Sequence, residues 1–375
     1  MANNITIRQL DNGVYDSLLP RTTASKSYLT NDTSALYNLQ NGTAEQAIQA
    51  IMRVIALSGN VSMRITDANG NPVVGAIVNG LVGSPISDEN GNVQGIYEYT
   101  PVNIVSPYVD LQDKSVDVKN YIGSINVLTV RLDTYAENTV RRYTNSRNVR
   151  FSKMVKTVDV CCVGGGAGGS GHSLVSSSYN FEPGGGGGGG GIVNSYGLSI
   201  ESDTPYAITI GFGGSSGGLW SYGNDGGDTS FLNVVGPGGK KVTTYKSDSG
   251  TTYVIGGLPG VVGCGNGAGN YDVQSQNNTT VSEFNDGVTF YSGGGGVGQW
   301  TSNQKENGGK PNGAYGAAAL VDNTGTATSK NAGTAGIGGG GGGAAWSSTY
   351  DSEKTRTGNS SAGGPGLVAI RLHFS

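Results

Sequence analysis

The stretch Pro183–Gly191 reads PGGGGGGGG, and shorter glycine runs recur at Gly164–Gly166, Gly293–Gly296 and Gly338–Gly343. Of the 67 glycines in the chain, 10 lie in residues 1–150, so the remaining 225 residues hold 57 (67 minus 10). Glycine-rich linkers are usually padded with Ser, Lys, Glu or Pro and carry few aromatic residues. Here the runs alternate with β-forming segments such as Tyr206–Ile210. The runs therefore indicate an ordered architecture.

A run of consecutive glycines has a specific way to order. It can adopt a polyproline-II-like helix, with three residues per turn and a rise of about 3.1 Å per residue, so Gly184–Gly191 would extend about 25 Å. Such a helix has no internal hydrogen bonds, so its N–H and C=O groups need outside partners. Without a Cβ, neighbouring helices approach closely enough to bond to one another. Eight glycines in succession and only 11 prolines exclude collagen. The glycines that we expect in this core include Gly184, Gly187, Gly191, Gly294 and Gly340.

Composition argues against several classes of function. Hydrophobic residues make up 35% of the chain and charged residues 13%, so backbone hydrogen bonding is expected to supply much of the cohesion. The net charge of −4 does not indicate the positively charged surface that binds nucleic acid. The sequence has no window of 18 apolar residues, so no membrane-spanning helix is predicted. The segment Met1–Arg8 lacks the apolar core of a signal peptide, which predicts assembly in the cytoplasm.

Catalytic and metal-binding chemistry finds no support in the sequence either. Three cysteines, Cys161, Cys162 and Cys264, are too few for a disulfide framework, and we expect Cys161 and Cys162 on a strand with at least one of them buried. With only His172 and His373 available, a zinc site and a Ser-His-Asp arrangement are both disfavoured. No carboxylate pair stands out for sugar hydrolysis. We therefore predict a protein that is not an enzyme, with no catalytic residue, metal or cofactor.

The N-terminal part, residues 1–59, is predicted to be an attachment arm that ends in a helix at about residues 43–58. Thr43 is a suitable N-cap, and Ile48, Ile51 and Ile55 form one apolar stripe. This stripe either packs on the next domain or forms a short trimeric bundle.

The rest of the chain is expected to be mainly β. Residues 60–133 combine alternating segments such as Val61–Ile65 with the turn sequence Asp67–Pro72, which predicts a small β-sandwich. Residues 134–154 are basic and predict a solvated linker. Residues 155–375 are expected to combine short strands with packed polyglycine helices, because β-rich segments such as Val155–Val163 run directly into glycines.

Two parts of the chain resemble known families. The words "ITDANGNPVVGAIV" and "SDENGNV" are similar to carboxypeptidase-regulatory-like and prealbumin-like modules, which implies a spacer. The order "VDVCCVGGGAGG", "EPGGGGGGGGIVN", "PYAITIGFGG", "NDGGDTSF" and "GGPGLVAIRLHF" resembles the glycine-rich domain of phage and prophage tail proteins. The words Leu19–Ala24 resemble N-terminal segments of tail-fibre proteins from phages of Gram-positive hosts. The glycine-rich part is also similar in concept to T-even-like adhesins.

These resemblances imply a function in adhesion. They imply a distal tail-fibre or receptor-binding protein of a phage or phage-tail-like particle, located in the virion tail. Its partners would be a host cell-surface carbohydrate or protein, and other tail or baseplate proteins through the N-terminus. A homotrimer is also implied. The alternatives are a structural tail-fibre or baseplate spacer, a secreted surface adhesin and a depolymerising tailspike.

Recognition is expected to reside in the inserts between the glycine runs, because loops on a rigid scaffold are free to vary. Aromatic faces and amides in these inserts suit carbohydrate or protein surfaces. A structural alternative is that the aromatics cap the glycine core and shield it from water. The candidate receptor-binding residues are Trp220, Tyr222, Tyr271, Trp300, Tyr315, Trp346 and Tyr350.

Overall fold

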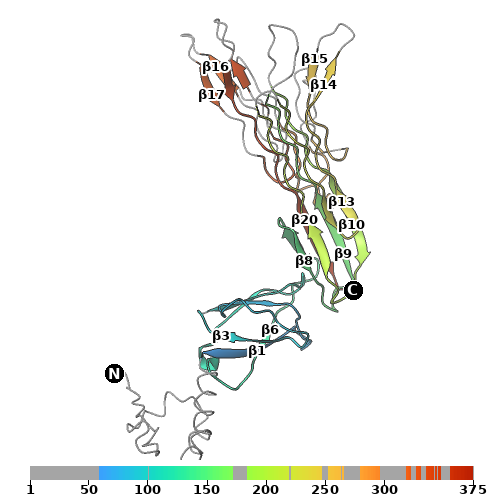
Figure 1. The fold of residues 1–375 in the computed structure, drawn as a ribbon. Coiled ribbons are helices and arrows are strands. Elements are labelled where there is room, and N and C mark those ends of the chain that lie inside the picture. Colours follow the sequence, from blue (N-terminus) through green and yellow to red (C-terminus); the bar gives the residue numbers. More distant parts are fainter. Residues whose placement is uncertain are drawn as a thin grey trace, which may run out of the picture. The chain divides into compact units, whose positions relative to one another are not determined.

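The computed structural model describes residues 59–99, 101–171, 184–218, 221–246, 252–262, 264–265, 279–295, 318–321, 327–330, 335–341, 343, 345–347 and 355–374. The fold is mainly β, and the chain divides into two compact units, Met1–Tyr135 and Ala136–Ser375 (Figure 1). The predicted arm and its helix at residues 43–58 lie outside the described residues.

The described part of unit 1 consists of two small sheets around one core. The first sheet has the order β3 (Asn92–Ile96), β1 (Asn60–Thr66) and β6 (Leu128–Arg131), and the second has the order β2 (Ile77–Asn79), β4 (Val102–Val105) and β5 (Lys114–Val116). A 3-10 turn, η3, covers Lys119–Tyr121. Side chains from both sheets, among them Met63 and Ile104, are buried in the shared core. The alternating sequence of β1 explains this packing, because successive residues of a strand face opposite sides.

Two similar turns connect the strands of unit 1. The sequences DANGN at residues 67–71 and DENGN at residues 88–92 both begin with an aspartate. Oδ1 of Asp67 accepts hydrogen bonds from the backbone N–H groups of Asn69 and Asn71 at 2.9 and 2.8 Å. Oδ1 of Asp88 accepts the equivalent pair at the same distances. Such aspartate-centred turns reverse the chain locally, which agrees with the turn chemistry of the sequence.

Unit 2 begins with two four-stranded sheets. One has the order β10 (Ile192–Ser199), β9 (Thr157–Val163), β20 (Leu367–His373) and β7 (Val140–Tyr143). The other has the order β13 (Val234–Gly236), β12 (Thr229–Phe231), β11 (Tyr206–Thr209) and β8 (Arg147–Val149). Strand β9 is antiparallel to both of its neighbours, and Cys161 and Cys162 within it are fully buried.

Residues 134–154 differ from the predicted linker, because they contain β7 and β8. Strand β7 pairs with β20 and β8 pairs with β11, so this basic stretch belongs to the sheets of unit 2. The charges remain compatible with strands because these two are edge strands, which often carry charged side chains.

The glycine runs continue from the ends of the strands and hydrogen-bond to one another. In residues 164–171, which follow β9, the direction of bonding repeats every third residue. The N–H groups of Gly164, Ala167 and Ser170 donate to the carbonyls of Gly191, Gly188 and Gly185. Those of Gly165, Gly168 and Gly171 donate to Gly227, Asn224 and Ser221, and those of Gly166 and Gly169 donate to Gly364 and Ser361. One segment thus bonds outward in three directions through its N–H groups alone.

Residues 184–191 bond in the same manner. Their N–H groups donate to three segments. The first segment supplies the carbonyls of Gly341 and Gly338, the second supplies those of Lys240 and Pro237, and the third supplies that of Gly265. Their carbonyls accept hydrogen bonds from three further segments. The donors are the N–H groups of Gly164 and Ala167 in the first segment, of Gly257 and Gly260 in the second, and of Gly295 in the third. We call this network of residues 164–171, 184–191, 211–218, 221–227, 237–240, 257–260, 292–295, 338–341 and 361–366 the glycine lattice.

Candidate functional site

The glycine lattice has two distinct ends. At the sheet end its segments join strands, as where Val163 of β9 leads into Gly164 and Gly191 leads into β10. At the opposite end, which we call the distal end, the N–H of Gly171 donates to the carbonyl of Ser221 and the N–H of Ser170 donates to that of Gly185. The hydroxyl of Ser360 donates to the carbonyl of Gly217 at 2.8 Å. Segments from distant parts of the sequence therefore reach the distal end together.

Three two-stranded ribbons continue beyond the lattice. They are β14 (Thr243–Lys246) with β15 (Thr252–Ile255), β16 (Ala318–Val321) with β17 (Ala327–Lys330), and β18 (Ala345–Ser347) with β19 (Thr355–Gly358). Figure 1 shows β14–β15 and β16–β17 beyond the glycine segments, on the side away from β9, β10 and the C-terminus. The ribbons β16–β17 and β18–β19 also contact each other. The distal end is thus the candidate functional site, because segments from distant parts of the sequence meet there and the ribbons extend beyond it.

Most of the predicted receptor-binding aromatics fall outside the described residues, namely Trp220, Tyr271, Trp300, Tyr315 and Tyr350. The backbone of Trp346 lies in β18, directly opposite Arg356 of β19. Tyr222 is half-buried, next to Ser221 at the distal end. The structure therefore leaves the role of this set as a prediction, and it locates two of its members in the distal region.

The β14–β15 ribbon contains two aromatic residues that the sequence reasoning missed. Tyr245 and Tyr253 are directly opposite each other in the antiparallel register. The available signal was the pair of short β-forming segments TTYK and TYVI on either side of a polar turn.

The structural glycines predicted from the sequence lie where neighbouring backbones approach closely. A Cβ placed on Gly187 would lie 2.6 Å from the carbonyl carbon of Ala167, and one on Gly340 would lie 2.7 Å from the carbonyl carbon of Gly187. A Cβ on Gly191 would lie 2.6 Å from Cγ2 of Val261. Gly184 and Gly294 are also buried, next to the backbones of Gly343 and Gly265 respectively. Gly187, Gly191 and Gly340 therefore have no space for a Cβ.

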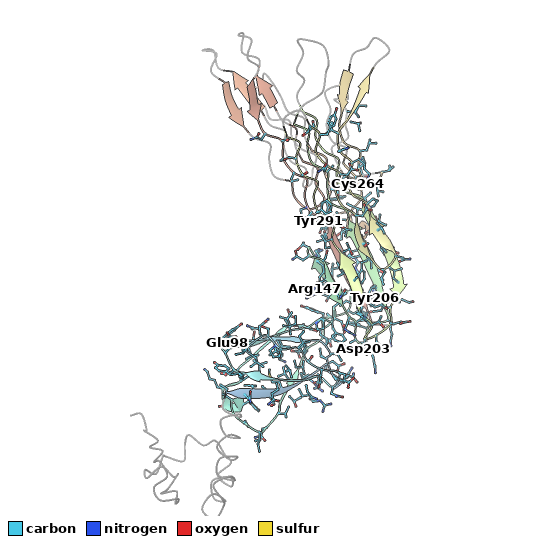
Figure 2. The ribbon with its side chains drawn as sticks, viewed as in Figure 1. Glu98, Arg147, Asp203, Tyr206, Cys264 and Tyr291 are labelled. Atoms are coloured by element: carbon cyan, nitrogen blue, oxygen red, sulfur yellow. The ribbon has the colours of Figure 1, made fainter. Side chains whose placement is uncertain are left out.

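At the sheet end, an ion pair joins the half-exposed Arg142 of β7 to the buried Glu283 of the turn η4 (Glu283–Asn285). Glu283, whose side chain is 1% exposed, accepts hydrogen bonds from Nη2 and Nε of Arg142 at 2.7 and 3.1 Å. The hydroxyl of Tyr291 donates to the same carboxylate at 2.6 Å. The hydrogen bond to Glu283 raises the pKa of Arg142, and burial followed by that same carboxylate raises the pKa of Tyr291. Figure 2 shows Tyr291 and Cys264 between the sheets and the distal ribbons.

The turn that carries Glu283 has an uncommon backbone. Phe284 and Asn285 both have positive φ, 49° and 53°, which a bulky residue such as Phe rarely adopts. The side chain of Asn194 holds this turn, because it accepts from the N–H of Phe284 at 3.0 Å and donates to the carbonyl of Ser282 at 2.9 Å. The guanidinium of Arg371 lies 4.2 Å from the centre of the Phe284 ring. These contacts offset the strain and fix residues 279–291 against the sheet.

A second cluster of polar and charged groups lies around Asp159, a residue of β9. Its carboxylate contacts Nε2 of His373 at 3.0 Å and Nη1 of Arg371 at 3.4 Å, and it accepts from the N–H of Gly197 at 2.9 Å. Burial alone would raise the pKa of Asp159, but the hydrogen bonds from Gly197 and His373 outweigh it and lower the pKa. The cluster therefore links β9 to β20 and to Gly197 of β10.

In the described part of the chain, no group of three or more His, Cys, Asp or Glu side chains is placed to hold a metal ion. Within the same residues, no helix has the length and apolarity needed to cross a membrane. Burial raises the pKa of Cys264 to about 11 and that of Cys162 to about 12, so these thiols are not reactive nucleophiles.

Comparison with known proteins agrees with this architecture. The model of a family described as a glycine-rich domain matches residues 142–373. The chain belongs to this glycine-rich domain family. The match begins inside β7 and ends at the last residue of β20, so the family unit contains both four-stranded sheets together with the glycine lattice. A comparison with curated proteins finds no match.

Proposed function

We propose that this protein is the distal tail-fibre or receptor-binding protein of a bacteriophage or phage-tail-like particle. In this proposal it recognises the host surface through the distal end of the glycine lattice. The observation that carries the proposal is that glycine segments from separate parts of the sequence reach one common end, where the ribbons begin. A rigid scaffold with connections gathered at one end suits recognition, because binding residues are often carried on loops that a scaffold positions.

We also propose that the lattice segments are polyglycine helices of the polyproline-II type. The hydrogen bonds of residues 164–171 change partner with a period of three, which is the number of residues per turn in that helix. An α-helix would bond within itself, and a strand would bond to two neighbours with a period of two. The six bonding directions of residues 184–191 follow from three N–H and three C=O groups per turn.

The physical advantage of this scaffold is its rigidity. Each hydrogen bond between segments contributes about 1 kcal/mol net, and the many glycines of the lattice have no side-chain rotamers to order. The glycine backbone loses much conformational entropy on folding, and the dense network of hydrogen bonds offsets that cost. A receptor-binding end supported in this way would stay pre-organised, which reduces the entropic cost of association.

The remaining parts of the chain fit supporting roles in this proposal. The sandwich of unit 1, with its resemblance to prealbumin-like modules, would act as a spacer. Residues 1–59 would attach to other tail or baseplate proteins, and the chain would assemble as a homotrimer in the virion tail. Recognition would involve a carbohydrate or protein of the host surface and no enzymatic step.

Competition for adsorption tests the proposal. Purified full-length protein is mixed with host bacteria before the particle is added, and free particles are counted after a short incubation. A receptor-binding protein blocks adsorption at saturating concentration, whereas a structural spacer leaves it unchanged. Release of oligosaccharide from envelope polysaccharide by the purified chain would instead indicate a depolymerase.

A further inference from the structure

The glycine lattice is complete around two central segments, residues 164–171 and 184–191. The N–H groups of residues 164–171 donate to three segments, and their carbonyls accept from three others, through the N–H groups of Gly239, Gly214 and Gly341. Residues 184–191 also bond in six directions. A helix with three residues per turn offers three N–H and three C=O groups per turn, so it has no seventh direction. A further segment can therefore be added only at the outer segments of the lattice.

Residues 211–218 form one of these outer segments, and their hydrogen bonds use only part of the backbone. They bond to three other segments, whose partner groups belong to Gly166 and Gly169, Gly363 and Gly366, and Asn224 and Gly227. Within the described part of the chain, the N–H groups of Phe212 and Ser215 and both backbone groups of Gly213 and Ser216 have no hydrogen-bond partner. These free groups define the side of the segment that we call the open edge.

Side chains are placed along the open edge with the same period of three. Gly211, Gly214 and Gly217 are buried, whereas Phe212 and Ser215, which follow Gly211 and Gly214, are exposed. Phe212 is 72% exposed, so its ring contributes little to the packing of the lattice. A bulky side chain therefore interrupts a glycine-rich segment at a position where the lattice itself does not need it.

Free backbone groups along an edge favour association with another chain. In β-sheets, edge strands present such a row of N–H and C=O groups, and proteins block these edges with side chains and irregularities. The spacing of the glycine lattice shows how a Cβ blocks a neighbour. A Cβ placed on Gly214 would lie 2.8 Å from the carbonyl carbon of Asn224, which is closer than such atoms pack. A segment seated at the same spacing on the open edge would meet the existing Cβ atoms of Phe212 and Ser215.

We propose that Phe212 and Ser215 are stops, which prevent a second copy of this chain from docking its own open edge against this one. A second copy is the partner that fits, because it presents the same free N–H and C=O groups and two identical edges can pair about a two-fold axis. The stops keep the glycine lattice within one chain. Contacts between chains in the proposed homotrimer then lie away from this edge, and the stops themselves do not depend on the function proposed above.

Two double variants of the full-length chain, which differ only in their Cβ atoms, test the stops. Phe212→Gly/Ser215→Gly removes them, whereas Phe212→Ala/Ser215→Ala removes the ring and the hydroxyl and keeps both Cβ atoms. Sedimentation velocity is measured over a range of protein concentrations. We expect the alanine variant to sediment as the wild type does. The glycine variant should form, as its concentration rises, a species of about twice the wild-type mass.

The direction of this effect separates the stops from an ordinary apolar contact. An exposed aromatic side chain that served as a contact would lose association when it is removed, in both variants alike. A glycine variant that is folded by calorimetry and keeps the wild-type mass at every concentration overturns the proposal. Association of the alanine variant to the same extent as the glycine variant also overturns it, and so does a mass below that of the wild type in the alanine variant.

Amide exchange in the folded wild type tests the open edge without any substitution. The N–H groups of Gly213 and Ser216 should exchange rapidly at low and at high protein concentration. Those of Gly214 and Gly217, which donate to residues 164–171 at 2.8 Å, should exchange slowly. Slow exchange of Gly213 and Ser216 in the wild type would mean that this edge is already covered, which refutes the proposal. This measurement decides between the outcomes even where the glycine variant does not fold.

Discussion

Substitution of Gly187 by alanine tests the glycine lattice at its centre. The added Cβ would lie 2.6 Å from the carbonyl carbon of Ala167 and 2.8 Å from the carbonyl oxygen of Gly168. Both neighbours are backbone atoms within the lattice, so no flexible side chain can move aside. The two segments must therefore separate by several tenths of an ångström or more.

The cost follows from the hydrogen bonds at this position. The N–H of Gly187 donates to Gly341 at 2.8 Å, its carbonyl accepts from Gly295 at 2.8 Å, and the N–H of Ala167 donates to Gly188 at 2.9 Å. Weakening three enclosed hydrogen bonds, at about 1 to 2 kcal/mol each, predicts a loss of about 3 to 6 kcal/mol. For a unit of this size, each kcal/mol lowers the melting temperature by about 2 to 4 °C. We expect a decrease of about 10 °C, and a larger one for Gly187→Val.

Differential scanning calorimetry of the full-length chain provides the measurement, and Gly218→Ala is the matched control. A Cβ on Gly218 has Oγ of Ser221 as its nearest neighbour, at 3.5 Å, and Gly218 has no positive φ. The control should melt within about 2 °C of wild type, because a compatible glycine-to-alanine change is neutral or slightly stabilising. Equal melting temperatures for the Gly187 and Gly218 variants would refute the close approach of segments on which the account depends.

Three further predictions concern the sheet end and the thiols. Glu283→Gln should lower the free energy of unfolding by about 2 to 3 kcal/mol in chemical denaturation, because it removes the buried carboxylate that pairs with the part-exposed guanidinium of Arg142. The control is Asp225→Asn, which removes the exposed pair with Lys240 and should change the free energy of unfolding by less than about 0.5 kcal/mol. The pKa of Asp159 is lower in the folded chain than its ordinary value of 3.8. The carboxylate therefore contributes fully to stability above pH 3.8, and this contribution is lost as the pH falls through the folded pKa. Asp159→Asn should flatten the pH dependence of the free energy of unfolding below about pH 4. A pH dependence identical to wild type would count against this carboxylate. Because burial raises the pKa of Cys162 to about 12 and that of Cys264 to about 11, neither should react with a disulfide reagent at pH 8 until the chain is denatured.

The parts of the fold that sequence could predict are those with a local pattern. The alternating segment Val61–Ile65 lies within β1, and the apolar stretch Leu367–Leu372 lies within β20. The predicted segment Val155–Val163 contains β9, and its buried cysteines behave as small apolar residues. In each case the information lies in consecutive residues, because strand periodicity is a short-range property.

Long-range pairing could not be read from the sequence. Strand β7 pairs with β20, and Arg142 of β7 meets Glu283 across 141 residues, so the basic stretch around it resembled a solvated linker. The order of the glycine segments was equally inaccessible. Register between strands is normally specified by side-chain pattern, and a run such as Gly184–Gly191 has none. The partners of each glycine depend on the whole fold.

The candidate site was only partly predictable for the same reason. Glycine runs and aromatic inserts indicated a scaffold with recognition segments, but the Tyr245–Tyr253 pair depends on the register of β14 and β15. Composition alone points to Tyr222 and Trp346, and their binding role remains a prediction. Sequence therefore suggested the kind of site, whereas the backbone register suggested which positions to test first.

Hydrogen–deuterium exchange of the full-length chain, with and without purified host envelope, tests the central claim most directly. The account predicts that the envelope slows exchange at the distal end, in residues 243–255 and around Ser221, and leaves β7 and β10 at the sheet end unchanged. Protection confined to the sheet end or to the sandwich of unit 1, with no change at the distal end, would contradict it.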